Sequence, residues 1–451
     1  MIARVAAAGA IVLVLTSATP WVAQAATASA GQSTCTNNLT ITAPLQLSNG
    51  EVLCDSGTLT NKSTITVVAG GSATIDAPTF VNEGMVSAPS GTALTFTNAP
   101  ANLSHGTLTG GKWAAAGTLS MPGQITTLDA WLKLSGGGEI EDSTTSNNAV
   151  SSLSTITSKG TFILDQSASP QTGSVTSAGH IILGTRGDSS DAVNWQDSGT
   201  FTMTGGTFTF LDGNACINVG PRAFNVTGGT ISGFGMVTGA VTVSGKAFFA
   251  PTLGTAQAEF WLNGSYTQTG GTFLDSVNDP SGTPSTGFLW VENGSVSLGG
   301  TLSVVSSGAR PAAGTQLSII TGAPVSGHFS AIRNSGVAGF SEQAAGTNAS
   351  LVAMSNSPPT APWIGHAGAA GAGAATVTWL APTFNGGQPV KGYAIRTLPA
   401  CACKGLTAGA TAKSSVVSGL RPGTTYTFVV VATNSVGTGV ASNPSNPVKI
   451  G

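Results

Sequence analysis

The sequence predicts an all-β protein, a right-handed parallel β-helix followed by a small β-sandwich. Gly and Pro contribute 62 and 22 of the 451 residues, which disfavours long helices. Charged residues make up only 8% of the chain and hydrophobic residues 41%, so the chain can fill a core but does not resemble a basic nucleic-acid binder or a charged disordered chain. A short phrase of Gly, Thr and alternating apolar and polar residues recurs along most of the chain, and repetition of this kind is typical of solenoids.

The N-terminal segment 1–25 has the pattern of a signal peptide. Arg4 precedes an apolar run that begins at Val5, and the small residues Ala23 and Ala25 form a cleavage pattern. The run ends before residue 19, which is short of the about 20 residues needed to span a bilayer. We therefore expect residues 1–25 to be removed and the rest to be secreted, in bacterial style, without a transmembrane anchor.

Five cysteines fit an exported protein, because disulfides form in oxidising compartments. Cys35 and Cys54 enclose 18 residues, and a bond between them would contribute roughly 3 kcal/mol. Cys401 and Cys403 are one residue apart, so a bond between them would be strained, and Cys216 has no evident partner. The four histidines are scattered along the chain, so no metal site and no cofactor is predicted.

Residues 26–354 form the repetitive body. Each phrase predicts a strand of about four to six residues that is opened by a turn, with Val, Ile, Leu and Phe facing inward and Thr, Ser and Asn facing outward. Gly160, Gly179 and Gly199 follow one another at intervals of about 20 residues, and an interval of that size predicts one coil per phrase. Asn-Gly pairs such as Asn49-Gly50 are typical of hairpins, so two or three antiparallel sandwiches remain an alternative for the body.

A Pro-rich linker, residues 355–362, separates the body from residues 363–451. All 18 acidic residues lie in the body together with 9 of the basic ones, which gives a net charge of −9, whereas the tail carries six Lys and Arg and no acid. Charges of opposite sign could attract the two parts to each other or to partners, but neither value is extreme.

Motifs in the tail resemble those of bacterial fibronectin type III domains. They are Ala375-Thr376-Val377-Thr378-Trp379 and Leu420-Arg421-Pro422-Gly423-Thr424-Thr425-Tyr426. The resemblance implies a β-sandwich in which Trp379 and Leu420 belong to the core and the Tyr426 hydroxyl bonds back to the chain. The body is similar, more loosely, to pectin-lyase-like β-helices and to autotransporter passenger repeats, through stretches such as Gly294–Leu302 and Gly314–Ile320.

Two groups of polar residues are candidates for a site. Glu139 and Glu141 would share one face of a strand at a spacing of about 7 Å, with Asp142 next to them, although a solvated outer face is the favoured explanation of these residues. The polar segment 186–197 contains Asp188, Asp191, Trp195 and Asp197, so Trp195 could stack on a sugar while the carboxylates accept hydrogen bonds or bind Ca²⁺. Asp142, Asp165, Asp188 and Asp212 recur at nearly constant intervals, which suggests a column of carboxylates, although the shorter glycine spacing would make it drift.

The other tryptophans of the body, Trp113, Trp131, Trp261 and Trp290, are not periodic with the phrase, and we expect them to fill the core or its rim. No catalytic residue is predicted. We therefore expect a secreted, non-catalytic adhesion, matrix or carbohydrate-contacting protein whose partners are polysaccharides, cell surfaces or matrix components and not nucleic acid. The alternative is an extracellular polysaccharide-degrading glycosidase or lyase with a fibronectin type III accessory module.

Overall fold

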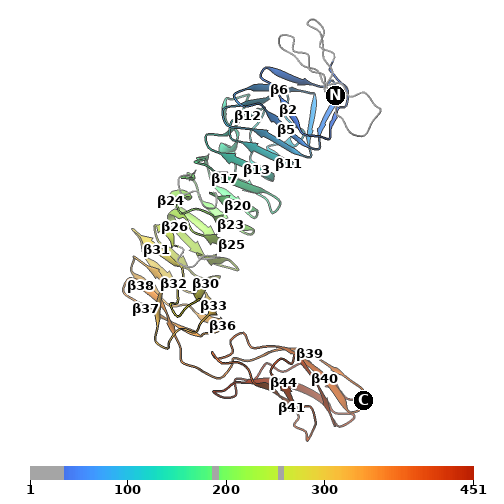
Figure 1. The fold of residues 1–451 in the computed structure, drawn as a ribbon, viewed down its shortest axis with the longest axis vertical. Helices are drawn as coiled ribbons and strands as arrows, with labels where there is room; N and C mark the ends of the chain where they lie inside the picture. Colours follow the sequence, from blue (N-terminus) through green and yellow to red (C-terminus); the bar gives the residue numbers. More distant parts are fainter. Residues whose placement is uncertain (1–34, 185–191, 252–258) are drawn as a thin grey trace.

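The computed structural model describes residues 35–184, 192–251 and 259–451. The predicted signal peptide lies outside these ranges. The described residues form strands and one short 3-10 helix, η1 (Ala149–Ser152), and none of them forms a helix that could cross a membrane. The body is an elongated stack of strands, and the C-terminal module follows at one end of it (Figure 1). The protein is thus all-β, as the sequence predicts.

Strands of the body pair with strands one coil further along the chain, in three ladders. The first ladder contains β1 (Thr40–Ile41), β4 (Thr58–Asn61), β7 (Thr79–Asn82), β16 (Thr155–Ile156), β19 (Val175–Ser177), β22 (Phe201–Met203), β29 (Tyr266–Gln268), β32 (Val296–Leu298) and β35 (Val325–Gly327). The second contains β2 (Leu45–Leu47), β5 (Thr64–Val67), β8 (Met85–Ala88), β17 (Thr161–Asp165), β20 (His180–Leu183), β23 (Thr207–Phe210), β25 (Thr230–Gly233), β27 (Phe248–Ala250), β30 (Thr272–Asp279), β33 (Thr301–Gly308) and β36 (Ala331–Gly336).

The third ladder contains β3 (Glu51–Cys54), β6 (Ser72–Asp76), β9 (Ala93–Phe96), β12 (Thr118–Met121), β14 (Glu139–Asp142), β18 (Gln171–Thr172), β21 (Asn194–Asp197), β28 (Glu259–Asn263), β31 (Phe288–Glu292) and β34 (Gln316–Thr321). Four longer strands pass from one ladder to another: β11 (Thr107–Ala115), β13 (Thr127–Ser135), β24 (Cys216–Val226) and β26 (Met236–Val243). Pairing within the ladders is parallel. Antiparallel pairs are made by β10 (Leu103–Ser104), β15 (Asn147–Asn148), β37 (Phe340–Ala345) and β38 (Asn348–Ala353). The antiparallel sandwiches considered for the body therefore do not match its pairing.

The register of the second ladder aligns apolar side chains from coil to coil. One unbroken series of partners, each at most 1% exposed, is Ile65, Val86, Trp113, Leu132, Phe162, Ile181, Phe208, Ile231, Phe249, Phe273 and Leu302. The residues just before them include Thr64, Thr161, Thr207, Thr272 and Thr301, which are only half-buried. Because successive side chains of a strand point to opposite faces, the alternation seen in the sequence separates the core from the surface.

Glycine is required where one coil crosses closely over the next. Gly206 has a φ of 66°, and a Cβ there would collide with the carbonyl oxygen of Gly179 on the preceding coil. Only Gly tolerates both conditions. This is the physical origin of the Gly-Thr phrase, whose Thr207 is the first residue of β23.

The interval of about 20 residues predicted from Gly160, Gly179 and Gly199 mixes glycines that belong to two different ladders. Thr161 pairs with His180 and His180 with Thr207, so Gly160 and Gly179 are followed in the ladder by Gly206. Gly199 precedes β22 of the first ladder. Asp142 and Asp165 do not stand in the predicted column for a related reason, because Asp142 ends a strand of the third ladder and Asp165 a strand of the second, while Asp188 lies outside the described residues.

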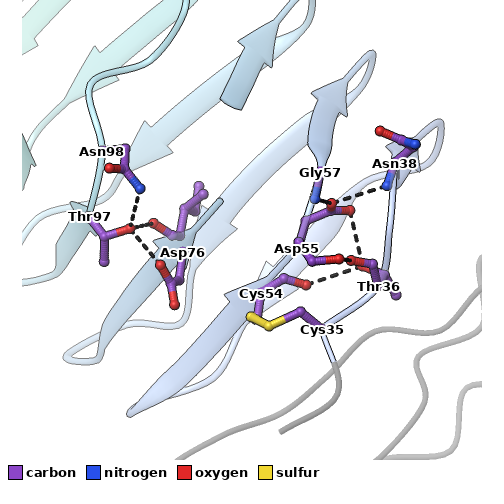
Figure 2. The surroundings of a disulfide bond; sticks show 11 residues. Cys35, Thr36, Asn38, Cys54, Asp55, Gly57, Asp76, Thr97 and Asn98 are labelled. Atoms are coloured by element: carbon purple, nitrogen blue, oxygen red, sulfur yellow. Dashed lines mark hydrogen bonds between the residues drawn. A yellow bond between two sulfur atoms is a disulfide. The ribbon is translucent and has the colours of Figure 1, made fainter. Parts of the chain in front are cut away.

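The first coil is fastened by a disulfide between Cys35 and Cys54. The neighbouring Asp55 is 2% exposed, and its carboxylate accepts hydrogen bonds from the Thr36 hydroxyl and from the backbone N–H groups of Asn38, Leu39 and Gly57. Figure 2 shows this carboxylate between the two chain segments that the disulfide joins. The two interactions together hold the start of the stack against its second coil.

The C-terminal module has two antiparallel sheets. One contains β39 (Trp363–Ala369), β40 (Ala374–Leu380) and β43 (Ser414–Ser418), and the other β41 (Gly392–Leu398), β42 (Thr407–Gly409), β44 (Thr425–Thr433) and β45 (Val448–Lys449). The module contacts the body directly. Phe384, 4% exposed, forms a β-bridge with Gly336 at the end of β36, and a Cβ on Gly387 of the module would lie 2.7 Å from the guanidinium carbon of Arg310 in the body.

Replacing Cys35 and Cys54 together with Ser should destabilise the first coils. The bond closes a loop with a sequence separation of 19, so its loss should cost roughly 3 kcal/mol by freeing the unfolded chain. Hydrogen exchange should show lower protection in β1 to β5 and unchanged protection in β28 to β33, because repeats contact only their neighbours. The control Cys401→Ser/Cys403→Ser should leave β1 to β5 unaffected. Equal loss of protection along the whole body would contradict this account.

Candidate functional site

Trp195, expected to stack on a sugar, lies in the core. It is fully buried, its ring contacts Phe162, Phe201 and Phe208, and its Nε1 donates to the Thr172 hydroxyl at 2.8 Å. This part of the predicted surface site is therefore wrong, because Trp195 occupies an inward position of β21. Asp188 and Asp191 lie outside the described residues.

Asp197 is also inward, two residues further along the same strand. It is 2% exposed, its Oδ1 accepts from the Gly199 N–H at 2.8 Å, and its buried Oδ2 has no hydrogen-bond partner among the described residues. Burial raises the pKa of Asp197 to about 6, and the bond from Gly199 offsets only part of that effect. Asp197 therefore has no access to an external ligand, and its unusual pKa reflects the core.

The acidic residues of β14 also divide into outward and buried side chains. Glu139 is exposed and Glu141 half-buried on the outer side, whereas Asp142 is 1% exposed. Burial would raise the pKa of Asp142, but hydrogen bonds from Thr144, Gly123 and Gln124 outweigh it and hold the pKa well below its usual range. A carboxylate with these partners fastens the turn after β14.

The three tail residues that the resemblance to fibronectin type III domains singled out lie where that resemblance implies. Trp379, Leu420 and Tyr426 are 2%, 2% and 4% exposed in one cluster. The Tyr426 hydroxyl accepts from the Arg421 N–H at 3.3 Å. Across the described part of the chain, no group of three or more His, Cys, Asp and Glu side chains is placed to hold a metal ion.

The most distinctive surface of the body is an aromatic pair on the third ladder. Trp261 of β28 and Trp290 of β31 are register partners, and their rings stack with centroids 5.9 Å apart at an angle of 27°. Trp261 is 40% exposed and Trp290 is half-buried. Gly322 lies beside this ring, since a Cβ there would stand 3.4 Å from the Trp290 indole, at ordinary contact distance.

Four more outward positions surround the pair, because residues two apart on a strand share a face. On β28 these are Glu259 and Asn263, and on β31 they are Phe288 and Glu292. The side chains between them, Phe260, Leu262, Leu289 and Val291, are at most 1% exposed and anchor both strands in the core. We call Glu259, Trp261, Asn263, Phe288, Trp290 and Glu292 the aromatic surface.

The expectation that Trp261 fills the core or its rim is corrected by its exposure. A signal for the pair was present in the sequence, since Trp261 and Trp290 are as far apart along the chain as Thr272 and Thr301, which pair in the neighbouring ladder. Two aromatics at the local coil interval are placed side by side by the register. Trp113, by contrast, is fully buried, as expected.

Comparison with known proteins identifies the C-terminal module. Residues 359–448 match the fibronectin type III domain family, so this part of the chain is a fibronectin type III domain. Two solved structures are similar to the chain. The match to the twitchin kinase region from C. elegans has 23% sequence identity and a TM-score of 0.19, and it covers 21% of this chain and 17% of the twitchin chain. Titin kinase with its flanking domains is 26% identical, covers 20% and 17%, and has a TM-score of 0.17.

Asp197→Asn should remove a pH dependence of stability. Because the pKa of Asp197 is raised to about 6 in the folded protein from about 3.9 when unfolded, its carboxyl favours folding at low pH, and this benefit is lost as pH rises through 6. The variant should gain on the order of 1–2 kcal/mol over the wild type at about pH 8 and nothing at about pH 4. Urea unfolding across that range measures the difference, and a difference independent of pH would refute it.

Proposed function

We propose that the chain is a secreted, non-catalytic protein that contacts carbohydrate, in adhesion or in a matrix, through the aromatic surface. The observation that supports it most is the stacked, solvent-exposed Trp261–Trp290 pair. Exposed aromatic rings offer apolar faces and edges for the C–H groups of a sugar, while adjacent polar side chains fix its orientation.

Polar side chains that could bond such a ligand lie beside the two indoles. Glu259, Asn263 and Glu292 lie on the same side of the sheet as the two indoles. Carboxylate and amide oxygens accept hydrogen bonds from hydroxyl groups, and the amide also donates.

The spacing of the carboxylates favours binding over cleavage. Glu259 begins β28 and Glu292 ends β31, and Glu259 is the register partner of Phe288. Their Cα atoms are therefore roughly 14 Å apart, from the rise along a strand and the distance between strands. Glycosidases hold their two carboxyl groups about 5–10 Å apart, and a backbone separation this wide does not by itself provide such a pair.

We also propose that the body is a right-handed parallel β-helix and that the protein acts outside the cell. The parallel ladders and the closely spaced coils support the architecture. Two disulfides, Cys35–Cys54 and Cys401–Cys403, and the signal-like residues 1–25 support export. The fibronectin type III domain would hold the body at a surface or space it from one.

Trp261→Ala should weaken retention of the protein by a polysaccharide. Losing the exposed indole should weaken affinity for the retained polymer at least about tenfold, because aromatic anchors dominate contacts of this kind. Affinity electrophoresis against a panel of soluble polysaccharides measures the effect. The matched control is Trp363→Ala, which removes an indole that is 74% exposed on the fibronectin type III domain and should leave retention unchanged.

Two results would contradict the proposal. Wild-type protein that binds no polysaccharide of the panel would exclude carbohydrate contact as its role. Release of reducing sugars that Glu139→Ala/Glu141→Ala abolishes would show an enzyme instead.

A further inference from the structure

The charge around the aromatic surface is entirely negative. Glu259 and Glu292 stand at opposite ends of it, and Glu292 is exposed and Glu259 half-buried. Neither forms an ion pair within the described residues. Both carboxylates are therefore available to a ligand.

Basic residues are absent from the strands on either side. In β26, β28, β31 and β34 there is no Lys or Arg. The nearest basic residue along the ladder in the described chain is Arg222 of β24, which lies where the register with β26 shifts. The body as a whole carries 9 basic and 18 acidic residues after position 25. Within the described residues, no Lys or Arg on these four strands offsets the field of the two carboxylates.

Aromatic faces add to this preference for positive charge. The face of an indole carries negative electrostatic potential, so an ammonium group near it is attracted. An exposed carboxylate also attracts an ammonium group, over several ångströms, and salt weakens this attraction. A ligand carrying carboxylates would instead be repelled from both ends of the surface.

We infer that the aromatic surface selects saccharides that carry protonated amino groups, such as glucosamine oligomers, over neutral ones, and rejects polyuronates. The inference rests on the proposed function, because it specifies which carbohydrates the same surface binds. The indoles bind the sugar, and Glu259 and Glu292 set the sign of the charge that it carries.

The test compares oligomers of equal length made of glucosamine, N-acetylglucosamine, glucose and galacturonate. Binding to the full chain is followed by calorimetry at about pH 5.5, where amines are protonated and carboxylates ionised, at low and at high salt. Glucosamine oligomers should bind about fivefold to tenfold more tightly than the neutral ones at low salt, with the difference shrinking at high salt. Galacturonate oligomers should not bind.

The variant Glu259→Gln/Glu292→Gln should lose this preference and retain its affinity for neutral oligomers. Its matched control is Glu139→Gln/Glu141→Gln, which removes two outer carboxylates from a coil far from the surface and should keep the preference. Equal affinity of the wild type for amino and neutral oligomers would overturn the charge selection and leave carbohydrate binding intact. Failure of every oligomer to bind would overturn both.

Discussion

The structure depends on parallel pairing in fixed register between successive coils. Since side chains alternate along a strand, a shift of one residue would turn a whole apolar set toward solvent. The register of the second ladder keeps Ile65, Val86 and Trp113 in one line with Phe162 and Phe208 several coils later. The same register places outward residues in lines. A surface feature such as the Trp261–Trp290 pair therefore needs only two residues at the local coil interval.

Polar groups inside the stack are tolerated because neighbouring coils satisfy them. Asn61 donates from Nδ2 to Asn82 Oδ1 at 2.9 Å, and Asn102 accepts from the Asn82 N–H at 2.6 Å. These three side chains are at most 8% exposed, so Asn61 and Asn102, although they stand in glycosylation motifs, are structural. Asn61 and Asn82 end the paired strands β4 and β7, so their amides link one coil to the next where the chain leaves the ladder.

Much of the fold could be predicted from the sequence, whereas the site could not. Alternation within each phrase predicted the inward side chains, and motifs around Trp379 and Tyr426 indicated the C-terminal domain. The coil interval was harder, because Gly199 and Gly206 belong to different ladders although they carry the same phrase. Trp195 was misjudged because its segment is rich in Asp and Ser. In fact Val193, Trp195 and Asp197 alternate with outward Asn194 and Gln196, and period two indicates a strand whatever its polarity.

The junction with the fibronectin type III domain limits how freely the two parts can move. Phe384 packs where a Cβ on Gly339 would collide with its ring, and Asn434 donates from Nδ2 to the carbonyls of Ser357 and Asn385 at 2.6 and 2.9 Å. The Pro-rich linker is thus bound to the domain that follows it. Antiparallel pairing of β34 with β38 closes the third ladder at the same end of the body (Figure 1), so the edge of this ladder is covered by the chain itself. Covering this one edge keeps β34 from recruiting another strand, whereas β35 and β36, the last strands of the first and second ladders, have no further strand paired beyond them in the described chain.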